Sequence, residues 1–478
     1  MRSFWRRGLL HTALLTLLTG TLVATPATAA EPAASDAGRW NGTGTERRSY
    51  TGTIDGAGYR VEVPQGWNGT LVLFSHGYYP PGWQPERIEL ANRPETEQWL
   101  LDHGYALAAS SFTGTVGYAV EPALHDQIAL LDWFDAHVGR PRQTVSTGQS
   151  LGAAVAVLLA ERHPRRFAGV STMCGEYDPL GTWNMALDLT FAIRTLLAPG
   201  EDIDLVRADD PTASAAALQQ AVQRAVGTPQ GQARIALAAS FGNVPGWYSA
   251  HLPEPTDPTE RILAQASWLE WAYSLGMGPT GRADLEARAG GNPSWNVGVD
   301  YTRQLARSAQ HDQVRAAYRA AGLDLRADLD RLATAPRIAA DPAAVGYLYR
   351  YGVPVGRTPV PVLSLHNIRD GGAVTDQERW YADQVRRNGD PGRLRQLYVN
   401  RGGHCAFSAA EEIVSLRSLL HRVDTGRWAD LDPHRLNRTA GGYAEPYQFV
   451  LDLATFADRP MPPAFVRHTP PEFLRPSR

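Results

Sequence analysis

The stretch Gln143-Thr144-Val145-Ser146-Thr147-Gly148-Gln149-Ser150-Leu151-Gly152 decides the fold class of this chain. Its first half is rich in β-branched residues and predicts a strand over 143–147, and the apolar run that follows predicts a helix over 151–163. Between them, residues 148–152 fit the pattern G-x-S-x-G. Small residues on both sides of a serine permit a sharp strand-to-helix turn that lifts the hydroxyl above a sheet. We therefore interpret Ser150 as a nucleophile, with an ordinary glycine-rich turn as the alternative.

Strand and helix patterns alternate on both sides of this turn. Strands are predicted at 46–53, 58–63, 69–75, 105–110, 167–173, 360–366 and 394–399, and helices at 121–137 and from about 376 and 409. Such alternation predicts an α/β fold, in which helices cover both faces of a mainly parallel sheet.

The alternation is interrupted between the strands at 167–173 and 360–366. This interval is rich in Ala, Leu and Arg at helical spacing and contains Pro-rich loops, which predicts a helical insertion that forms a cap. We divide the chain into a signal peptide, a first core part, the cap, a second core part and an extended tail on the surface, at 1–30, 31–173, 174–357, 358–423 and 424–478.

The overall composition excludes several classes of protein. The chain has 478 residues, of which 43% are hydrophobic, so it can bury a large core. A formal net charge of -3 and dispersed arginines provide no basic surface for nucleic acid. The sequence contains no lysine, which excludes Schiff-base, Ser-Lys and P-loop chemistry.

Residues 1–30 have the layout of a cleaved secretory signal. Arginines, an apolar run and a small-residue site follow one another at Arg2, Arg6 and Arg7, at 9–23 and at Ala27-Thr28-Ala29. We expect cleavage after Ala29 or Ala30, secretion, and no stable membrane anchor in the mature chain. An uncleaved anchor is the alternative, but the apolar run is short for a bilayer span. The pair Arg6-Arg7 also resembles a twin-arginine signal, so the Sec and Tat routes both stay open.

A serine hydroxyl needs a base, and His404 is the candidate. It follows Asn400-Arg401-Gly402-Gly403 directly after the last predicted strand, and the glycines let the loop bend back over the sheet. Other histidines fall in less suitable places: His76 in an early loop, His366 inside a strand, and His163 and His421 late in helices.

A carboxylate must hold the imidazole in one tautomer, and Asp370 lies in the loop just beyond the strand at 360–366. The order Ser150, Asp370, His404 is the one expected for this architecture. Competing acids are Asp376, Glu176 and Asp178, each of which could instead cap a helix or a turn.

Two amides are candidates for an oxyanion hole. The first is the amide of Leu151, which follows the nucleophile at a helix N-terminus. The second is the amide of Tyr78 in the loop 75–79, where Gly77 allows close backbone approach. The alternative is that His76-Gly77 forms only a tight turn.

The mature chain contains two cysteines, Cys174 and Cys405. In an oxidising compartment an even pair predicts a disulfide, and two separate buried thiols are the alternative. Without a compact Cys/His cluster in the sequence we expect no metal site and no cofactor.

These motifs, in this order, resemble the α/β-hydrolase fold over 45–173 and 358–423. His404-Cys405 also resembles the disulfide-linked His-Cys element of tannase and feruloyl-esterase-type hydrolases, in which a second cysteine directly precedes the nucleophile. Gln149 occupies that position here, so Cys174 is the only available partner. The more general resemblance is to secreted actinobacterial α/β-hydrolases, often likened to prolyl-oligopeptidase-like peptidases and esterases.

The predicted function is hydrolysis of a carboxylic ester, from a small molecule or a polymer, through an acyl-enzyme. Amide or peptide cleavage uses the same triad, but no propeller-like repeat indicates a prolyl oligopeptidase. A non-catalytic binding protein on a hydrolase scaffold is a third hypothesis, which a missing triad member would favour. Tryptophans of the insertion either line a substrate pocket or form the core of the cap: Trp183, Trp247, Trp268, Trp271 and Trp295.

Overall fold

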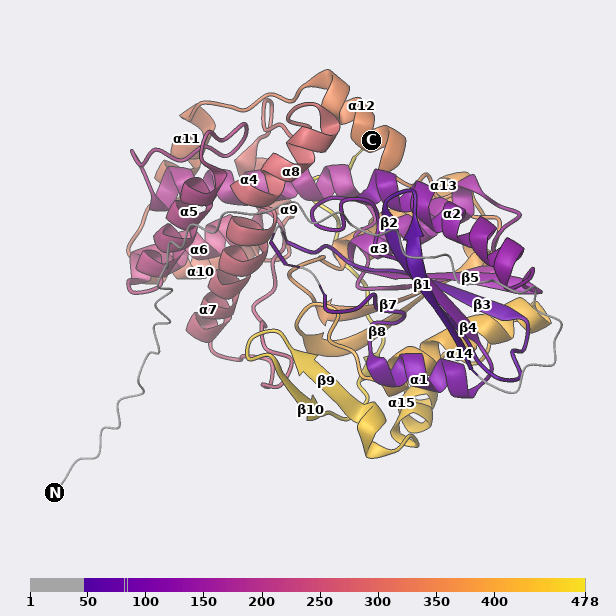
Figure 1. The fold of residues 1–478 in the computed structure, drawn as a ribbon. Coiled ribbons are helices and arrows are strands. Elements are labelled where there is room, and N and C mark those ends of the chain that lie inside the picture. Colours follow the sequence, from indigo (N-terminus) through magenta and orange to yellow (C-terminus); the bar gives the residue numbers. More distant parts are fainter. Residues whose placement is uncertain (1–46, 81, 84, 478) are drawn as a thin grey trace, which may run out of the picture. The chain divides into compact units, whose positions relative to one another are not determined.

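A nine-stranded sheet forms the centre of the structure (Figure 1). The computed structural model describes residues 47–80, 82, 83 and 85–477, and the predicted signal peptide lies outside them. The strands run in the order β1 (Arg48–Ile54), β2 (Ala57–Val63), β4 (Ala106–Ser110), β3 (Thr70–Ser75), β5 (Gln143–Gln149), β6 (Gly169–Met173), β7 (Val362–Arg369), β8 (Leu394–Gly402) and β11 (Phe465–Val466). From β4 to β8 neighbouring strands are parallel, while β1, β2 and β11 pair antiparallel.

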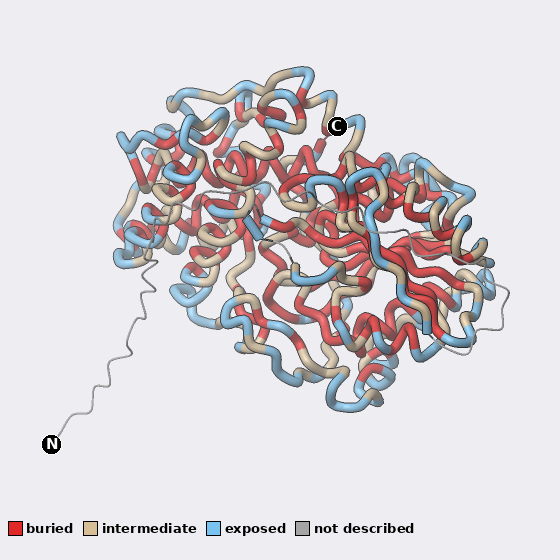
Figure 2. The backbone as a smooth tube through the Cα atoms, in the orientation of Figure 1, coloured by how far each residue is buried: buried red, intermediate tan, exposed pale blue. Residues whose placement is uncertain are grey.

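Helices cover both faces of this sheet, as the sequence predicted. Along β3, Leu71 and Leu73 pack on one face, and Val72 and Phe74 pack on the other, because successive side chains of a strand point to opposite sides. The first face is covered by α2 (Val120–His137), α3 (Leu151–Arg162) and α13 (Asp376–Asn388). The second is covered by α1 (Pro94–Asp102) and α14 (Ala409–Thr425). The burial colouring in Figure 2 shows the strands between these layers as buried.

The insertion between β6 and β7 is helical and gathers into a bundle beside the sheet (Figure 1). Its elements are α4 (Pro179–Leu197), α5 (Pro211–Ala225), α6 (Pro229–Ser240), α7 (Pro258–Trp268), the π-helix η1 (Leu269–Gly276), α8 (Pro279–Ala289), α9 (Tyr301–Arg307), α10 (His311–Ala320), α11 (Leu325–Thr334) and α12 (Pro342–Tyr351). Aspartate-proline pairs begin several of them. In α4 and α5 the Asp178 and Asp210 carboxylates accept hydrogen bonds from the third backbone N–H of the helix, and proline occupies the first turn.

The end of the chain corrects one expectation. The segment 424–478 is not a simple extended tail, because it contains α15 (Pro433–Gly441), the 3-10 helix η3 (Glu445–Gln448) and a hairpin of β9 (Phe449–Asp452) and β10 (Ala457–Pro460). Its last strand, β11, pairs with β8 and extends the sheet. Phe473 and Leu474 are buried as well. These elements are too short to produce a clear hydrophobic period, so they left no signal in the sequence.

Helix α1 is a second element that the sequence patterns did not reveal. Its nine residues carry one buried tryptophan and two leucines in succession rather than at helical spacing. A proline at its start marks the N-terminus in retrospect. None of the helices in the described part of the chain combines the length and the apolar character needed to cross a bilayer.

Candidate active site

The turn between β5 and α3 holds Ser150 in an unusual backbone conformation. Its φ is 52° and its ψ is -123°, a region that costs about 1–3 kcal/mol for a residue with a side chain. The two glycines of the motif permit the turn. A Cβ on Gly148 would lie 2.0 Å from the carbonyl oxygen of Gly152, and one on Gly152 would lie 2.1 Å from that of Ser75. The G-x-S-x-G pattern therefore reflects close backbone contacts that no larger residue could make.

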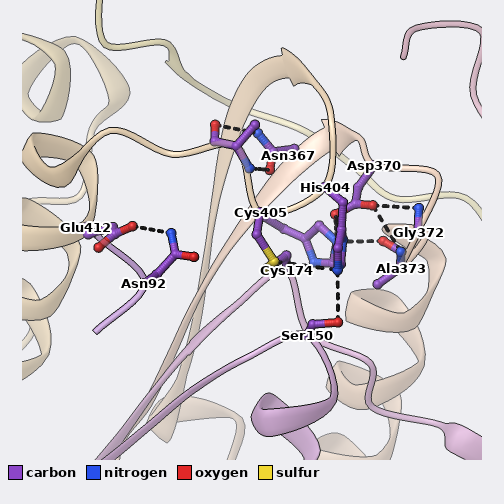
Figure 3. The surroundings of a disulfide bond; sticks show 12 residues. Asn92, Ser150, Cys174, Asn367, Asp370, Gly372, Ala373, His404, Cys405 and Glu412 are labelled. Atoms are coloured by element: carbon purple, nitrogen blue, oxygen red, sulfur yellow. Dashed lines mark hydrogen bonds and ion pairs between the residues drawn. A yellow bond between two sulfur atoms is a disulfide. The ribbon is translucent and has the colours of Figure 1, made fainter. Parts of the chain in front are cut away.

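The three predicted triad residues lie together above the sheet (Figure 3). His404 Nε2 lies 2.9 Å from Ser150 Oγ, and His404 Nδ1 lies 2.8 Å from Asp370 Oδ2. The residues come from the ends of β5, β7 and β8, which meet at one rim because parallel strands end on the same side. This chain of hydrogen bonds can carry the serine proton to the imidazole while the carboxylate fixes the ring.

The Asp370 loop is held by its own backbone. Asp370 Oδ1 accepts hydrogen bonds from the N–H groups of Gly372 (2.8 Å) and Ala373 (3.0 Å) and the residue is 1% exposed. The loop also passes between two rings. A Cβ on Gly371 would come within 2.4 Å of the Trp268 indole, and one on Gly372 within 3.0 Å of the His404 ring. Both carboxylate oxygens are thereby occupied, which leaves the aspartate one orientation.

Asn367 ties the His404 loop to β7, and the sequence patterns did not single it out. Its Oδ1 accepts a hydrogen bond from Ala406 N–H, and its Nδ2 donates one to Ala406 C=O, both at 3.1 Å (Figure 3). The buried Arg401 also donates to Ala406 C=O at 2.8 Å and pairs with Glu411. An asparagine at the end of a buried strand, three residues before the acid, is the signal that could have indicated this role.

The competing acids have other partners. Asp376 accepts a hydrogen bond from Asn243 Nδ2 at 2.6 Å, and burial raises its pKa to about 7. Asp178 caps α4 and accepts a hydrogen bond from Ser477 N–H. Glu176 lies closer to the nucleophile, because its backbone N–H donates to the Ser150 carbonyl oxygen at 3.2 Å.

Among the competing histidines, the two nearest the rim are held in place by packing. His76 is stacked between Tyr79 and Phe112 at centroid distances of 4.3 and 4.1 Å, and burial lowers its pKa to about 4. His366 is fully buried in β7, where its Nδ1 lies 2.9 Å from Glu378.

The loop 75–79 reaches the nucleophile. A Cβ on Gly77 would lie 3.2 Å from Ser150 Cβ, so a glycine lets this loop approach the turn. Within the described residues, neither the Tyr78 nor the Leu151 backbone N–H donates a hydrogen bond to another protein group. Two amides near one serine are the arrangement that an oxyanion needs.

A disulfide joins Cys174 and Cys405 beside the triad (Figure 3). It links the end of β6 to the residue that follows His404, and Cys405 Sγ lies 3.6 Å from His404 Nε2. Both cysteines have positive φ, 45° and 53°. The bond therefore tethers the loop of the predicted base to the strand next to the nucleophile strand.

A cavity of about 340 Å³ opens at Ser150 and His404. Its walls come from the loop after β3, the loop after β6 and the insertion, and they are mostly apolar: Tyr78, Pro80, Tyr118, Glu176, Trp183, Trp271, Ala272, Leu275, Gly276, Met277, Gly372 and Ala373. Trp183 and Trp271 of the predicted tryptophan set line it, whereas Trp268 is buried and donates from Nε1 to the Trp247 carbonyl oxygen. The π-helix η1 supplies several wall residues, as π-turns often do at functional sites.

The strand order, the antiparallel β2 and the serine turn after β5 define the class of this protein. The chain belongs to the α/β-hydrolase superfamily. Residues 91–328 match the family described as "Esterase: Putative esterase". That match indicates a hydrolase.

Individual relatives are more distant. The chain is 28% identical over 419 residues to a curated protein, "o-phthalyl amidase" of Xanthobacter agilis, and the alignment covers 81% of this chain and 89% of that protein. Among solved structures, feruloyl esterase B from Aspergillus oryzae is 11% identical with a TM-score of 0.39, covering 80% of this chain and 82% of that one. An esterase from Aspergillus oryzae is 13% identical with a TM-score of 0.37, covering 80% and 81%.

Proposed function

We propose that the protein is a secreted serine hydrolase that cleaves a carboxylic ester through an acyl-enzyme. The observation that carries the proposal is the continuous hydrogen-bonded chain from Ser150 through His404 to Asp370 at the wall of an apolar cavity. The match of residues 91–328 to an esterase family supports it.

The first half of the reaction forms the acyl-enzyme. Ser150 Oγ attacks the ester carbonyl carbon while His404 Nε2 takes the hydroxyl proton. The carbonyl oxygen becomes an oxyanion that accepts hydrogen bonds from the amides of Tyr78 and Leu151. The tetrahedral intermediate then collapses, the carbon–oxygen bond to the alcohol breaks, and the alcohol leaves with the proton from His404.

The second half releases the acid. His404 removes a proton from a water molecule, and the hydroxide attacks the acyl carbon. When this intermediate collapses, Ser150 Oγ leaves and recovers its proton from His404. Asp370 holds Nδ1–H of His404 throughout and stabilises the imidazolium.

The test uses a panel of 4-nitrophenyl esters and hydroxycinnamate esters with the wild type and Ser150→Ala. We expect the wild type to release nitrophenol with an initial burst equal to the enzyme concentration, and the variant to show none. Equal rates for the two proteins would contradict the assignment of Ser150.

Amide hydrolysis is the second candidate, because the curated relative is an o-phthalyl amidase. The same triad serves, but an amine is a poorer leaving group and needs protonation by His404. A phthalyl ester and a phthalyl amide share one acyl group, so their kcat/KM values separate the candidates. A faster amide than ester at matched acyl group would favour the amidase.

Secretion is part of the proposal and rests on the layout of residues 1–30 and on the disulfide. N-terminal sequencing of protein from a culture supernatant should begin at Ala30 or Glu31. Retention of the full N-terminus in a membrane fraction would favour an anchor.

A further inference from the structure

The cavity at Ser150 has an exposed end and a buried end. Pro80 is exposed and Leu275 is 43% exposed, whereas Tyr118 and Trp183 are 2% and 1% exposed. In a reaction through an acyl-enzyme the alcohol leaves first, and water must then reach the acyl carbon. An alcohol at the buried end would have to pass the acyl group bound to Ser150. The buried end therefore suits the acyl part of the substrate.

This buried end carries polar atoms that no protein group satisfies. Within the described residues, Glu176 Oε1, Tyr118 OH and Trp183 Nε1 are buried and have no hydrogen-bond partner. Other buried polar atoms lack partners too, for example Tyr381 OH and Trp380 Nε1, but those side chains do not line the cavity. Three such groups on the wall of one cavity, otherwise mostly apolar, indicate a place for a polar part of a ligand.

The three side chains are held firmly. Glu176 follows the disulfide-bonded Cys174 by two residues, and its N–H donates to the Ser150 carbonyl oxygen. Tyr118 packs edge-on against Trp183, with ring centroids 5.8 Å apart, and its N–H donates to Asp284 at 2.7 Å. Fixed groups lose little freedom when they bind, which favours selective recognition.

Charges near this end favour an uncharged ligand group. Burial, reinforced by the charge of Asp178, raises the pKa of Glu176 to about 8, while a hydrogen bond from Thr182 opposes this. On the other side, the buried Arg282 guanidinium lies 5.2 Å from the Trp183 ring centroid and donates to its carbonyl oxygen. No arginine is among the described residues that line the cavity, so a buried carboxylate would find no counter-ion there.

A hydroxyl group matches these neighbours. Trp183 Nε1–H can only donate, Tyr118 OH can donate or accept, and the Glu176 carboxyl can accept. A hydroxyl oxygen can accept from the indole side while its proton is donated on the glutamate side. We propose that Glu176, Tyr118 and Trp183 form a subsite for a hydroxyl group at the far end of the acyl part of the substrate. This inference rests on the proposed ester hydrolysis.

The experiment compares three acyl groups on one leaving group. The substrates are 4-nitrophenyl esters of benzoic, phenylacetic and 3-phenylpropanoic acid, each with hydrogen, hydroxyl or carboxylate at the para position, so that the substituent samples the depth of the cavity. At the best spacer length we expect kcat/KM for the hydroxyl ester to exceed that of the hydrogen ester about tenfold, with the carboxylate slowest. A preference for the hydrogen or the carboxylate ester at every length would overturn the proposal.

Variants assign any preference to these residues. Tyr118→Phe and Trp183→Phe should each bring the hydroxyl-to-hydrogen ratio most of the way to one, chiefly through KM. Tyr381→Phe and Trp380→Phe make the same chemical changes at equally unpartnered buried atoms away from the cavity, and they should leave the ratio at its wild-type value. A ratio that persists in both cavity variants would also contradict the subsite.

The unsubstituted esters separate the two proposals. If the wild type hydrolyses none of the esters, ester hydrolysis itself fails. If it hydrolyses the unsubstituted esters in a Ser150-dependent manner and the para-hydroxyl group gives no advantage, only the subsite fails. Binding of 3-(4-hydroxyphenyl)propanamide to Ser150→Ala, measured by calorimetry against 3-phenylpropanamide, provides a readout that does not depend on turnover.

Discussion

The rim of the sheet and the cap side of the cavity differ in how their polar groups are satisfied. At the rim, both oxygens of Asp370 and both nitrogens of His404 have partners within the protein. Across the cavity, Tyr118 and Trp183 are as deeply buried, yet their polar atoms have no partner within the described residues. A complete network fixes a geometry, whereas an incomplete one leaves capacity for a ligand. We infer that chemistry belongs to the rim and selectivity to the cap side.

The largest effect should come from breaking the rim at its ends. Ser150→Ala and His404→Ala should each lower kcat on the order of 10³-fold or more, because proton transfer and nucleophilic attack are lost. The double variant should be little worse than either single one, since the residues act as a unit. Steady-state kinetics on 4-nitrophenyl esters measure this, and circular dichroism checks that the fold is kept. Additive losses in the double variant would argue for independent roles.

A somewhat smaller effect should follow from changing the acid. Asp370→Asn should lower kcat on the order of 10²- to 10⁴-fold, because the amide favours the wrong tautomer of His404. Asp376→Asn is the matched control, since Asp376 is equally buried but hydrogen bonds to Asn243 instead. Its loss should stay below tenfold. The reverse ranking in kcat would move the acid to Asp376.

The disulfide offers a third way to loosen the rim. Its cysteines are separated by 231 positions, so the loss of loop entropy predicts up to about 5 kcal/mol of stability, an upper figure. The double variant Cys174→Ser/Cys405→Ser should unfold at a lower urea concentration and lose activity severalfold, because the His404 loop is less ordered. Peptide mapping without reduction should show the Cys174–Cys405 pair. Free thiols at both positions in secreted protein would contradict the pairing.

The core elements and the triad were predictable because their signals are local. The β-branched run before Ser150, the glycines around it and the acid just past β7 each follow from short-range chemistry. The C-terminal segment was not, since α15, the β9–β10 hairpin and β11 acquire their structure from packing against distant parts of the chain. Short elements lack the periodicity on which such predictions depend.

The cavity wall was only partly predictable for a similar reason. Trp183 and Trp271 were listed among tryptophans of the insertion, but nothing in the sequence separated them from Trp268, which is core. Glu176 was noticed as an acid after a buried strand, and its contact with the Ser150 backbone required the structure. Tyr118 follows a glycine in a loop after β4 and had no pattern to mark it. Which side chains face a cavity depends on tertiary contacts.

The smallest expected effect concerns Glu176 and the pH dependence of stability. Its pKa of about 8 in the folded protein lies above the ordinary value of 4.5, because burial disfavours the charged form. Between these values the folded state holds a proton that the unfolded state has released, so the free energy of unfolding falls as pH rises. The stability from neutral Glu176 is thus complete below about pH 4.5 and lost by about pH 8. Glu176→Gln cannot titrate and should escape this loss.

The measurement is the urea midpoint of the wild type and of Glu176→Gln at pH 5 and pH 8. The difference in unfolding free energy between the two proteins should shift in favour of the variant by on the order of 2 kcal/mol across this interval. Asp178 and Asp376, whose pKa values burial also raises, titrate in both proteins and cancel in the comparison. A difference that stays constant with pH would show that Glu176 is already ionised when folded. The cap side of the cavity would then be as well satisfied as the rim, and the contrast between the two regions would not hold.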